Sequence, residues 1–210
     1  MRRILLFSHV TEEAQRRVFP LLFPDQLSPK VFACMPANGA LHGRSYELFC
    51  DSWQAIAQQH HAEFVYIDNA QEDAEEERVK LQRANILCIT GGNACLLLRN
   101  LRRSGLDRGI KDFARKEQYV LAGYSAGAMV LTPTVRLAAW EPFNENREVG
   151  LTTFEALGLV NYEVFPHYSA ETQAAFERYR CSSPNLVKPL TDDAYICLDS
   201  SENAADEGLS

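Results

Sequence analysis

The sequence of 210 residues predicts an α/β fold built around a doubly wound, mostly parallel sheet with helices on both faces. The first observation is a set of short, continuous apolar runs, at residues 4–7, 31–35, 64–67, 86–89 and 119–122. Continuous runs of this length are typical of parallel strands that are buried on both faces. The second observation is a set of longer stretches with an apolar side chain at every third or fourth position, at residues 45–60, 70–84 and 93–103. Strands that alternate with helices in this way indicate crossover connections between parallel strands.

The individual elements follow the chain in that order. Residues 4–7 form the first expected strand, and they are too few for the apolar segment of a signal peptide. The acidic run 71–77 opens an expected helix, where carboxylates favour the positive end of the helix dipole. A short helix over 126–131 follows the last of the five strands, and four further apolar runs come after it. Residues 1–199 are therefore expected to form a single domain, and the polar, acidic residues 200–210 a flexible tail.

Composition and charge argue against several classes of protein. Hydrophobic residues make up 46% and charged residues 23%, as in a globular domain with a core rather than a disordered chain. The net charge of −7 argues against a nucleic-acid partner, and no run approaches the roughly 18 apolar residues of a membrane span. The six cysteines form no C-x-x-C pair, which favours a reducing compartment. We therefore expect a cytoplasmic protein that binds neither nucleic acid nor membrane.

The motif Gly123-Tyr124-Ser125-Ala126-Gly127 lies directly after an expected strand and before a short helix. This G-x-S-x-G pattern in a strand, turn and helix is typical of a nucleophile elbow. The sharp turn holds the serine in strained backbone geometry, the glycines leave room for the turn, and the helix start directs N–H groups at an oxyanion. Ser125 is therefore the candidate nucleophile. The alternative is a glycine-rich turn that only packs a helix onto the sheet.

A second loop, Thr90-Gly91-Gly92-Asn93, follows the fourth expected strand and precedes a helix. Adjacent glycines let the backbone approach a ligand closely, so the amide of Gly92 can pair with that of Ala126 as two oxyanion donors. A helix start with Asn93 as its cap explains the same residues.

A serine nucleophile needs a general base, and the chain contains five histidines. His167 follows an apolar run and a proline that fixes the approach of the chain, so it is the expected base. His9 follows the first strand at the same edge of the sheet and is the second candidate. An acid must orient the imidazole, and Asp192, Asp193 and Glu141 lie near strand ends. Spacing alone does not choose among these acids.

These motifs, taken in order, resemble peptidase E and its relatives in serine peptidase family S51, which includes the cyanophycinases. The resemblance runs from the first strand to Leu198 and rests on residues 90–93, 123–127, 133–136 and 165–168. It implies a class I glutamine-amidotransferase-like, flavodoxin-like α/β fold with a nucleophile elbow. It also implies a hydrolase with Ser125 as nucleophile, His167 as base, and Gly92 and Ala126 amides as oxyanion donors, without a metal or other cofactor. The implied activity is that of a dipeptidase that cleaves short peptides after an amino-terminal aspartate.

Two departures from the family pattern bear on the acid and on specificity. One family aspartate aligns with Trp140, next to Glu141, while the other acid proposed for the family aligns near Asp192. We therefore expect Asp192 as the orienting acid, with Glu141 as the alternative. The arginine that would bind a substrate aspartate aligns with Gln173, and Arg178 lies farther along the same helix. Gln173 and Arg178 are therefore candidate substrate-binding residues.

Two other functions fit the same motifs. Trp140 stands in place of a family aspartate, and Gln173, whose amide provides no charge, stands in place of an arginine. The alternative is therefore a catalytically degenerate family member that binds a small peptide or partner. An α/β-hydrolase-type esterase shares G-x-S-x-G, but its acid precedes its histidine, and here the histidine comes only 42 positions after the serine. The expected partner is a small peptide, which Asn93 is also placed to bind, and the protein is expected to be a monomer or a homodimer.

Overall fold

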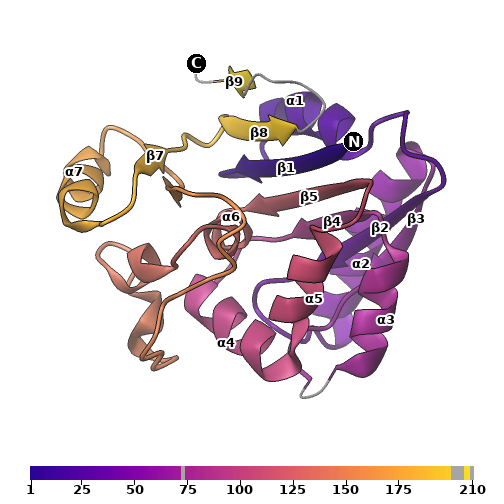
Figure 1. Cartoon of the computed structure of the whole chain (residues 1–210), viewed down its shortest axis with the longest axis horizontal. Coiled ribbons are helices and arrows are strands. Elements are labelled where there is room, and N and C mark those ends of the chain that lie inside the picture. Colours follow the sequence, from indigo (N-terminus) through magenta and orange to yellow (C-terminus); the bar gives the residue numbers. More distant parts are fainter. Residues whose placement is uncertain (72–73, 200–205, 209–210) are drawn as a thin grey trace.

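The computed structural model describes residues 1–71, 74–199 and 206–208, and its main sheet is drawn in Figure 1. The strands of this sheet are β1 (Arg2–Phe7), β2 (Lys30–Met35), β3 (Ala62–Tyr66), β4 (Ile86–Ile89), β5 (Tyr119–Tyr124), β8 (Tyr195–Asp199) and β9 (Asp206–Gly208). They lie in the order β3-β2-β4-β5-β1-β8-β9. The first five strands of that order pair in parallel, and β8 and β9 are antiparallel additions at one edge. The expected α/β fold with a mostly parallel sheet is thus confirmed.

Helices cover both faces of the main sheet. They are α1 (Glu12–Leu22), α2 (Gly43–Gln59), α3 (Glu75–Arg83), α4 (Ala94–Ser104), α5 (Leu106–Phe113) and α6 (Ala126–Leu131). On one face, Leu5 of β1 shares a core with Trp53 of α2. On the other face, the next residue, Leu6, shares a core with Leu97 of α4. Because alternate residues of a strand serve the two cores, the strands have to be apolar throughout.

The carboxyl ends of four parallel strands lie side by side at one edge of the main sheet. Phe7 is in register with Tyr124, and Ile89 is in register with Gly123 and Met35. The loops that follow β1, β2, β4 and β5 therefore meet at this edge. Open α/β sheets bind their ligands at such an edge.

A small second sheet, formed by residues that precede β8, lies beside the main sheet (Figure 1). It pairs β6 (Glu163–Phe165) with β7 (Val187–Pro189) in parallel, and α7 (Gln173–Ser182) connects the two strands. The buried carboxylate of Glu163 accepts hydrogen bonds from Tyr179 Oη (2.5 Å), Asn185 Nδ2 (2.7 Å) and Thr134 Oγ1 (2.9 Å). Thr134 belongs to the segment between α6 and β6, which also holds the 3-10 helices η1 (Arg136–Ala139) and η2 (Glu145–Arg147). The buried network therefore ties this segment to α7 and to the second sheet.

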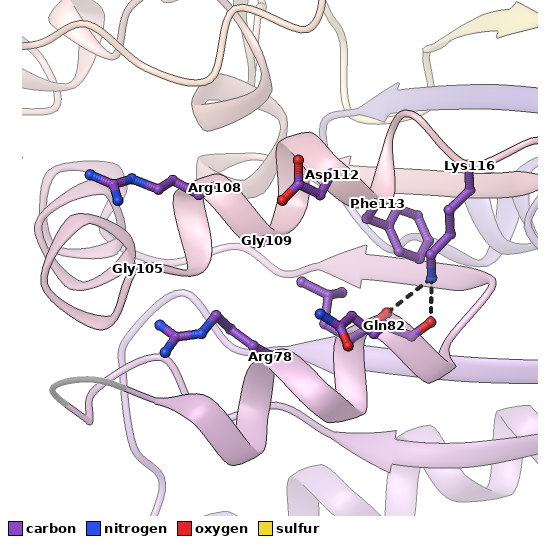
Figure 2. A pocket seen from close by; sticks show the side chains of 9 residues that line it. Arg78, Gln82, Gly105, Arg108, Gly109, Asp112, Phe113 and Lys116 are labelled. Atoms are coloured by element: carbon purple, nitrogen blue, oxygen red, sulfur yellow. Dashed lines mark hydrogen bonds between the residues drawn. The ribbon is translucent and has the colours of Figure 1, made fainter.

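A cavity of about 490 Å³ lies between α3 and α5 (Figure 2). Lys116 donates from Nζ to the carbonyl oxygens of Gln82 (2.7 Å) and Ala84 (2.5 Å) at the end of α3, and burial lowers the pKa of Lys116. Arg78 reaches out from α3 and Arg108 from α5 (Figure 2). The residues that line this cavity lie on or next to α3 and α5, away from the loops that follow the strands. The cavity therefore belongs to the packing of the helices.

Besides α6, which was expected from the serine motif, three helices, α1, α5 and α7, lie outside the stretches predicted from periodicity. Pro20 interrupts the pattern of α1, and α5 has only 8 residues, with Gly109 among them. Of the expected tail, residues 200–205 and 209–210 lie outside the described residues, and residues 206–208 form β9. In the described part of the chain, no helix combines the length and the hydropathy needed to cross a membrane.

Candidate active site

Ser125 lies in the turn between β5 and α6, at the edge where the parallel strands end. Its φ of 49° and ψ of −114° are uncommon for a residue with a side chain. Its N–H donates to the carbonyl oxygen of Phe7, the last residue of β1 (3.0 Å). Backbone strain of this kind persists only where the surroundings hold it in place.

The two glycines of the serine motif allow α6 to pack directly on the strands. A Cβ at Gly127 would lie 2.6 Å from the carbonyl carbon of Ile89, and one at Gly123 would lie 2.8 Å from the amide nitrogen of Ala128. These obstacles are backbone atoms in a close-packed interior, and they cannot turn aside as the end of a side chain does. The Gly127 N–H also donates to the carbonyl oxygen of Thr90 (3.1 Å). The turn therefore requires glycine at both positions.

The second sheet brings a histidine and an aspartate to Ser125. His167 follows β6 by two residues and Asp192 follows β7 by three, and the two strands are parallel, so both residues emerge at the same end. Ser125 Oγ is 2.9 Å from His167 Nε2, and His167 Nδ1 is 2.7 Å from Asp192 Oδ1. A carboxylate only accepts, so Nδ1 carries the hydrogen and Nε2 is left to accept from the Ser125 hydroxyl. An imidazole in this arrangement can remove a proton from the serine.

The other two acids considered from the sequence lie elsewhere. Asp193 Oδ1 accepts a hydrogen bond from Thr11 Oγ1 (2.6 Å), the N-cap of α1. Glu141 is exposed and lines a cavity beside α7. Of the three acids, Asp192 is the one that is hydrogen-bonded to His167.

Ser8, directly after β1, belongs to this site and was missed by sequence reasoning. Its buried Oγ accepts from the His167 N–H (2.6 Å) and donates to Asp192 Oδ1 (3.1 Å). His9, the second candidate base, stands edge-to-face to the ring of His167, with 6.0 Å between the ring centroids. The sequence places Ser8 at the end of the first strand, but this position alone does not distinguish it as a site residue.

The loop after β4 lies against the serine turn. A Cβ at Gly91 would lie 3.3 Å from the Cβ of Ser125, and the neighbouring Gly92 has a φ of 149°. Within the described residues, the amides of Gly92 and Ala126 have no acceptor. These two amides are the expected oxyanion donors.

Asn93 caps α4 and is engaged at both ends of its side chain. Its Oδ1 accepts from the Leu96 N–H (2.7 Å), and its Nδ2 donates to the carbonyl oxygen of Glu145 (3.0 Å). The Glu145 carboxylate accepts from the Ala94 N–H (2.5 Å) at the same helix start, and burial raises the pKa of Glu145. Sequence reasoning missed this second cap, because no motif marks it.

The expected substrate-binding residues Gln173 and Arg178 both lie on α7. Gln173 is exposed at the first position of this helix. Arg178 lines a cavity of about 560 Å³. The lining also includes Glu141, Glu171 and Thr172. Thr172 Oγ1 donates to the carbonyl oxygen of His167 (3.2 Å), so the cavity adjoins the candidate base.

The described residues contain no cluster of metal-binding side chains, and most of their thiols are buried. Nowhere in that part of the chain do three or more His, Cys, Asp or Glu side chains gather to hold a metal ion. Four of the six cysteines are buried. One of them, Cys95 at the start of α4, has its pKa raised to about 12 by burial and by the neighbouring Glu145. A thiol with so high a pKa stays protonated at neutral pH and is a weak nucleophile.

Known proteins share this sequence pattern. Residues 24–199 match the family model described as Peptidase family S51. A stretch of 104 residues is 34% identical to an uncharacterized peptidase of Listeria monocytogenes and covers 49% of either chain. A stretch of 89 residues is 32% identical to peptidase E of Salmonella arizonae and covers 42% of this chain and 36% of the relative. The chain thus spans about half, or less, of the length of the curated relatives it matches.

Two solved structures are similar over nearly the whole chain. A Listeria monocytogenes protein assigned to peptidase E has a TM-score of 0.76 at 22% identity, over 100% of both chains. A peptidase from an acI-B1 actinobacterium has a TM-score of 0.67 at 19% identity, over 99% of this chain and 85% of the other. At these identities the likeness shows a shared fold.

Proposed function

The chain belongs to peptidase family S51, and we propose that it is a serine peptidase that hydrolyses short peptides through an acyl-enzyme. The observation that carries this proposal is the hydrogen-bonded series Ser125, His167 and Asp192. The serine is held in a strained turn, and the acid selects the imidazole tautomer that can accept its proton. Family membership supports a peptidase, and this geometry supports the serine type.

In the proposed reaction, Ser125 Oγ attacks the scissile carbonyl carbon while His167 Nε2 takes the hydroxyl proton. The amides of Gly92 and Ala126 donate to the oxygen that becomes negatively charged. His167 returns the proton to the leaving amine as the C–N bond breaks, and an ester remains on Ser125. Water then attacks the ester and loses a proton to the same nitrogen, and this proton passes to Ser125 Oγ as the C–O bond breaks and the acid is released. Asp192 holds the imidazole and stabilises its charge while the proton is on it.

The cavity beside α7 bears on substrate choice. It carries the guanidinium of Arg178, but also two carboxylates, those of Glu141 and Glu171. An aspartate side chain needs a cation that is not outweighed by carboxylates. We therefore propose that the chain prefers short peptides with neutral or basic side chains at this cavity over Asp-Xaa peptides.

A family member that binds peptides without turnover is the second candidate, and one observation favours it. Trp140, which stands where the family has an aspartate, packs edge-to-face on Tyr179 with 5.3 Å between the ring centroids. This position therefore adds an aromatic ring to the core and supplies no carboxylate to the site.

Hydrolysis of a mixed library of dipeptides and tripeptides, followed by mass spectrometry, tests the proposal. Wild type should consume peptides that Ser125→Ala leaves intact, and a fluorophosphonate should label wild type alone. Consumption of Asp-Xaa peptides before all others would overturn the proposed preference while supporting the mechanism. A wild-type protein that consumes no peptide and takes up no label would favour the binding protein.

A further inference from the structure

Ser8 is a fully buried serine whose hydroxyl contacts both proposed partners of the nucleophile. Its Oγ accepts from the His167 N–H (2.6 Å), donates to Asp192 Oδ1 (3.1 Å) and lies 3.5 Å from His167 Nδ1. A hydroxyl has one hydrogen to donate, and the carboxylate is the acceptor in this set, so the direction of each bond is fixed. We propose that Ser8 is a positioning residue for the His167–Asp192 pair, an inference that rests on the proposed function.

The backbone of His167 needs such support. Its φ of 56° lies in the left-handed region, which is uncommon for a residue with a side chain. Hydrogen bonds hold it on both sides: the N–H donates to Ser8 Oγ, and the carbonyl oxygen accepts from Thr172 Oγ1 (3.2 Å). Removal of the Ser8 hydroxyl leaves the His167 N–H without its acceptor and frees this side of the loop.

The carboxylate of Asp192 needs support as well, because its side chain is 50% exposed and water competes for it. Oδ1 accepts from His167 Nδ1 (2.7 Å) on one side and from buried Ser8 on the other. Two donors that converge on one oxygen restrain rotation of the carboxylate toward water. A functional side chain that is held by a neighbouring hydrogen bond keeps the orientation that its function needs.

The end of β1 connects the two parts of the proposed site. The carbonyl oxygen of Phe7 accepts from the Ser125 N–H (3.0 Å), and the next residue, Ser8, accepts from the His167 N–H. Ser125 follows a strand of the main sheet and His167 follows a strand of the second sheet. Phe7, the last residue of β1, and Ser8, the residue after it, therefore set the separation between the proposed nucleophile and the proposed base.

Ser8→Ala tests the proposal, with Ser104→Ala as the matched control. Ser104 is also fully buried, and its Oγ donates to the Leu101 carbonyl oxygen (3.2 Å) and accepts from the Leu106 N–H (3.4 Å), at the far end of α4 from the site. On a peptide found by the library screen, Ser8→Ala should lower kcat by about 10-fold to 100-fold with little change in KM. Ser104→Ala should leave kcat unchanged.

Proton NMR adds a readout that a merely structural role would not move. The hydrogen between His167 Nδ1 and Asp192 should give a low-field resonance that Asp192→Asn abolishes. In Ser8→Ala this resonance should move upfield or broaden by exchange with water, while in Ser104→Ala it should stay in place. If Ser8→Ala does not fold, Ser8→Cys serves instead, because its thiol fills the space and donates only weakly.

The outcomes separate this proposal from the proposed function. An active wild type together with an unchanged kcat and resonance in Ser8→Ala overturns the role of Ser8 alone. Equal losses of kcat in Ser8→Ala and Ser104→Ala overturn it too, because they indicate a general effect of removing a buried hydroxyl. A wild type without hydrolysis or fluorophosphonate labelling overturns the proposed function, and the role of Ser8 falls with it.

Discussion

Gly127→Ala should both destabilise the fold and displace Ser125, because it adds a methyl group where α6 crosses the end of β4. The added Cβ would lie 2.6 Å from the carbonyl carbon of Ile89. An ordinary contact between carbon atoms has a separation of about 3.5 Å. The carbonyl oxygen of Ile89 would lie closer still to the added Cβ, so α6 has to move away from β4 by at least this difference, about 0.9 Å.

The expected loss of stability follows from three terms. The strain of overpacking costs about 1–3 kcal/mol, and the hydrogen bond from the Gly127 N–H to the Thr90 carbonyl oxygen contributes about 1 kcal/mol. In the opposite direction, alanine is favoured over glycine in a helix by about 1 kcal/mol. The free energy of unfolding should therefore fall by about 2 kcal/mol, and Tm by about 4–8 °C for a chain of this length. A displacement close to 1 Å at the reacting serine should lower kcat about 100-fold.

Gly109→Ala in α5 is the matched control for Gly127→Ala. There the added Cβ would meet the flexible end of the Leu81 side chain at 3.2 Å, so stability should stay within about 1 kcal/mol of wild type and kcat should not change. Urea unfolding followed by tryptophan fluorescence measures the first quantity, and hydrolysis of a substrate peptide the second. A Gly127→Ala protein with the urea midpoint and the kcat of wild type would refute the reasoning.

Three further predictions concern the nucleophile and the acids. Ser125→Ala should abolish hydrolysis and fluorophosphonate labelling while its thermal unfolding stays close to wild type, since one hydroxyl is removed; residual full activity would contradict the assignment. Asp192→Asn should lower kcat by up to ~10⁴-fold, far more than Glu141→Gln, and the reverse ranking in steady-state kinetics would move the orienting role to Glu141. Burial raises the pKa of Glu145 above 4.5, so its contribution to stability is present below that pH and is lost as pH rises through the raised pKa. Glu145→Gln keeps an acceptor for the helix start and removes this loss. The difference in urea midpoint between Glu145→Gln and wild type should therefore grow in favour of the variant from pH 4.5 to neutrality. A difference in urea midpoint that does not change with pH would contradict this prediction.

The central strands could be predicted because burial on both faces leaves them no polar positions. The helices α1 and α5 could not, since Pro20 and Gly109 disturb their periodicity although tertiary packing buries their apolar sides. In both cases the contacts that stabilise the helix come from distant parts of the chain. The spacing of apolar residues in the sequence reveals such a helix only where the helix is long and regular.

The candidate site also combines residues that a local motif marks with residues that only the tertiary structure brings together. Ser125 is marked by a local motif, and its glycines are required by close backbone contacts, those of Gly123 within the turn and those of Gly127 with the end of β4. The orienting acid could not be chosen from spacing, because the pairing of β6 with β7 decides that Asp192 rather than Glu141 reaches His167. Ser8 lies 159 positions from His167 in the sequence, and no pattern within the chain connects the two.

The proposed site depends on the position of the small sheet relative to the large one. Ser125 follows a strand of the large sheet, whereas His167 and Asp192 follow strands of the small one, and the end of β1 is hydrogen-bonded to Ser125 and to His167. Local opening free energies differ across a structure, and we expect the small sheet, whose two strands have 3 residues each, to open before the large one. On heating, hydrolysis should therefore stop while most of the helical and strand signal persists. A compound that spans serine and histidine would act as a clamp between the two sheets and raise the temperature at which they separate.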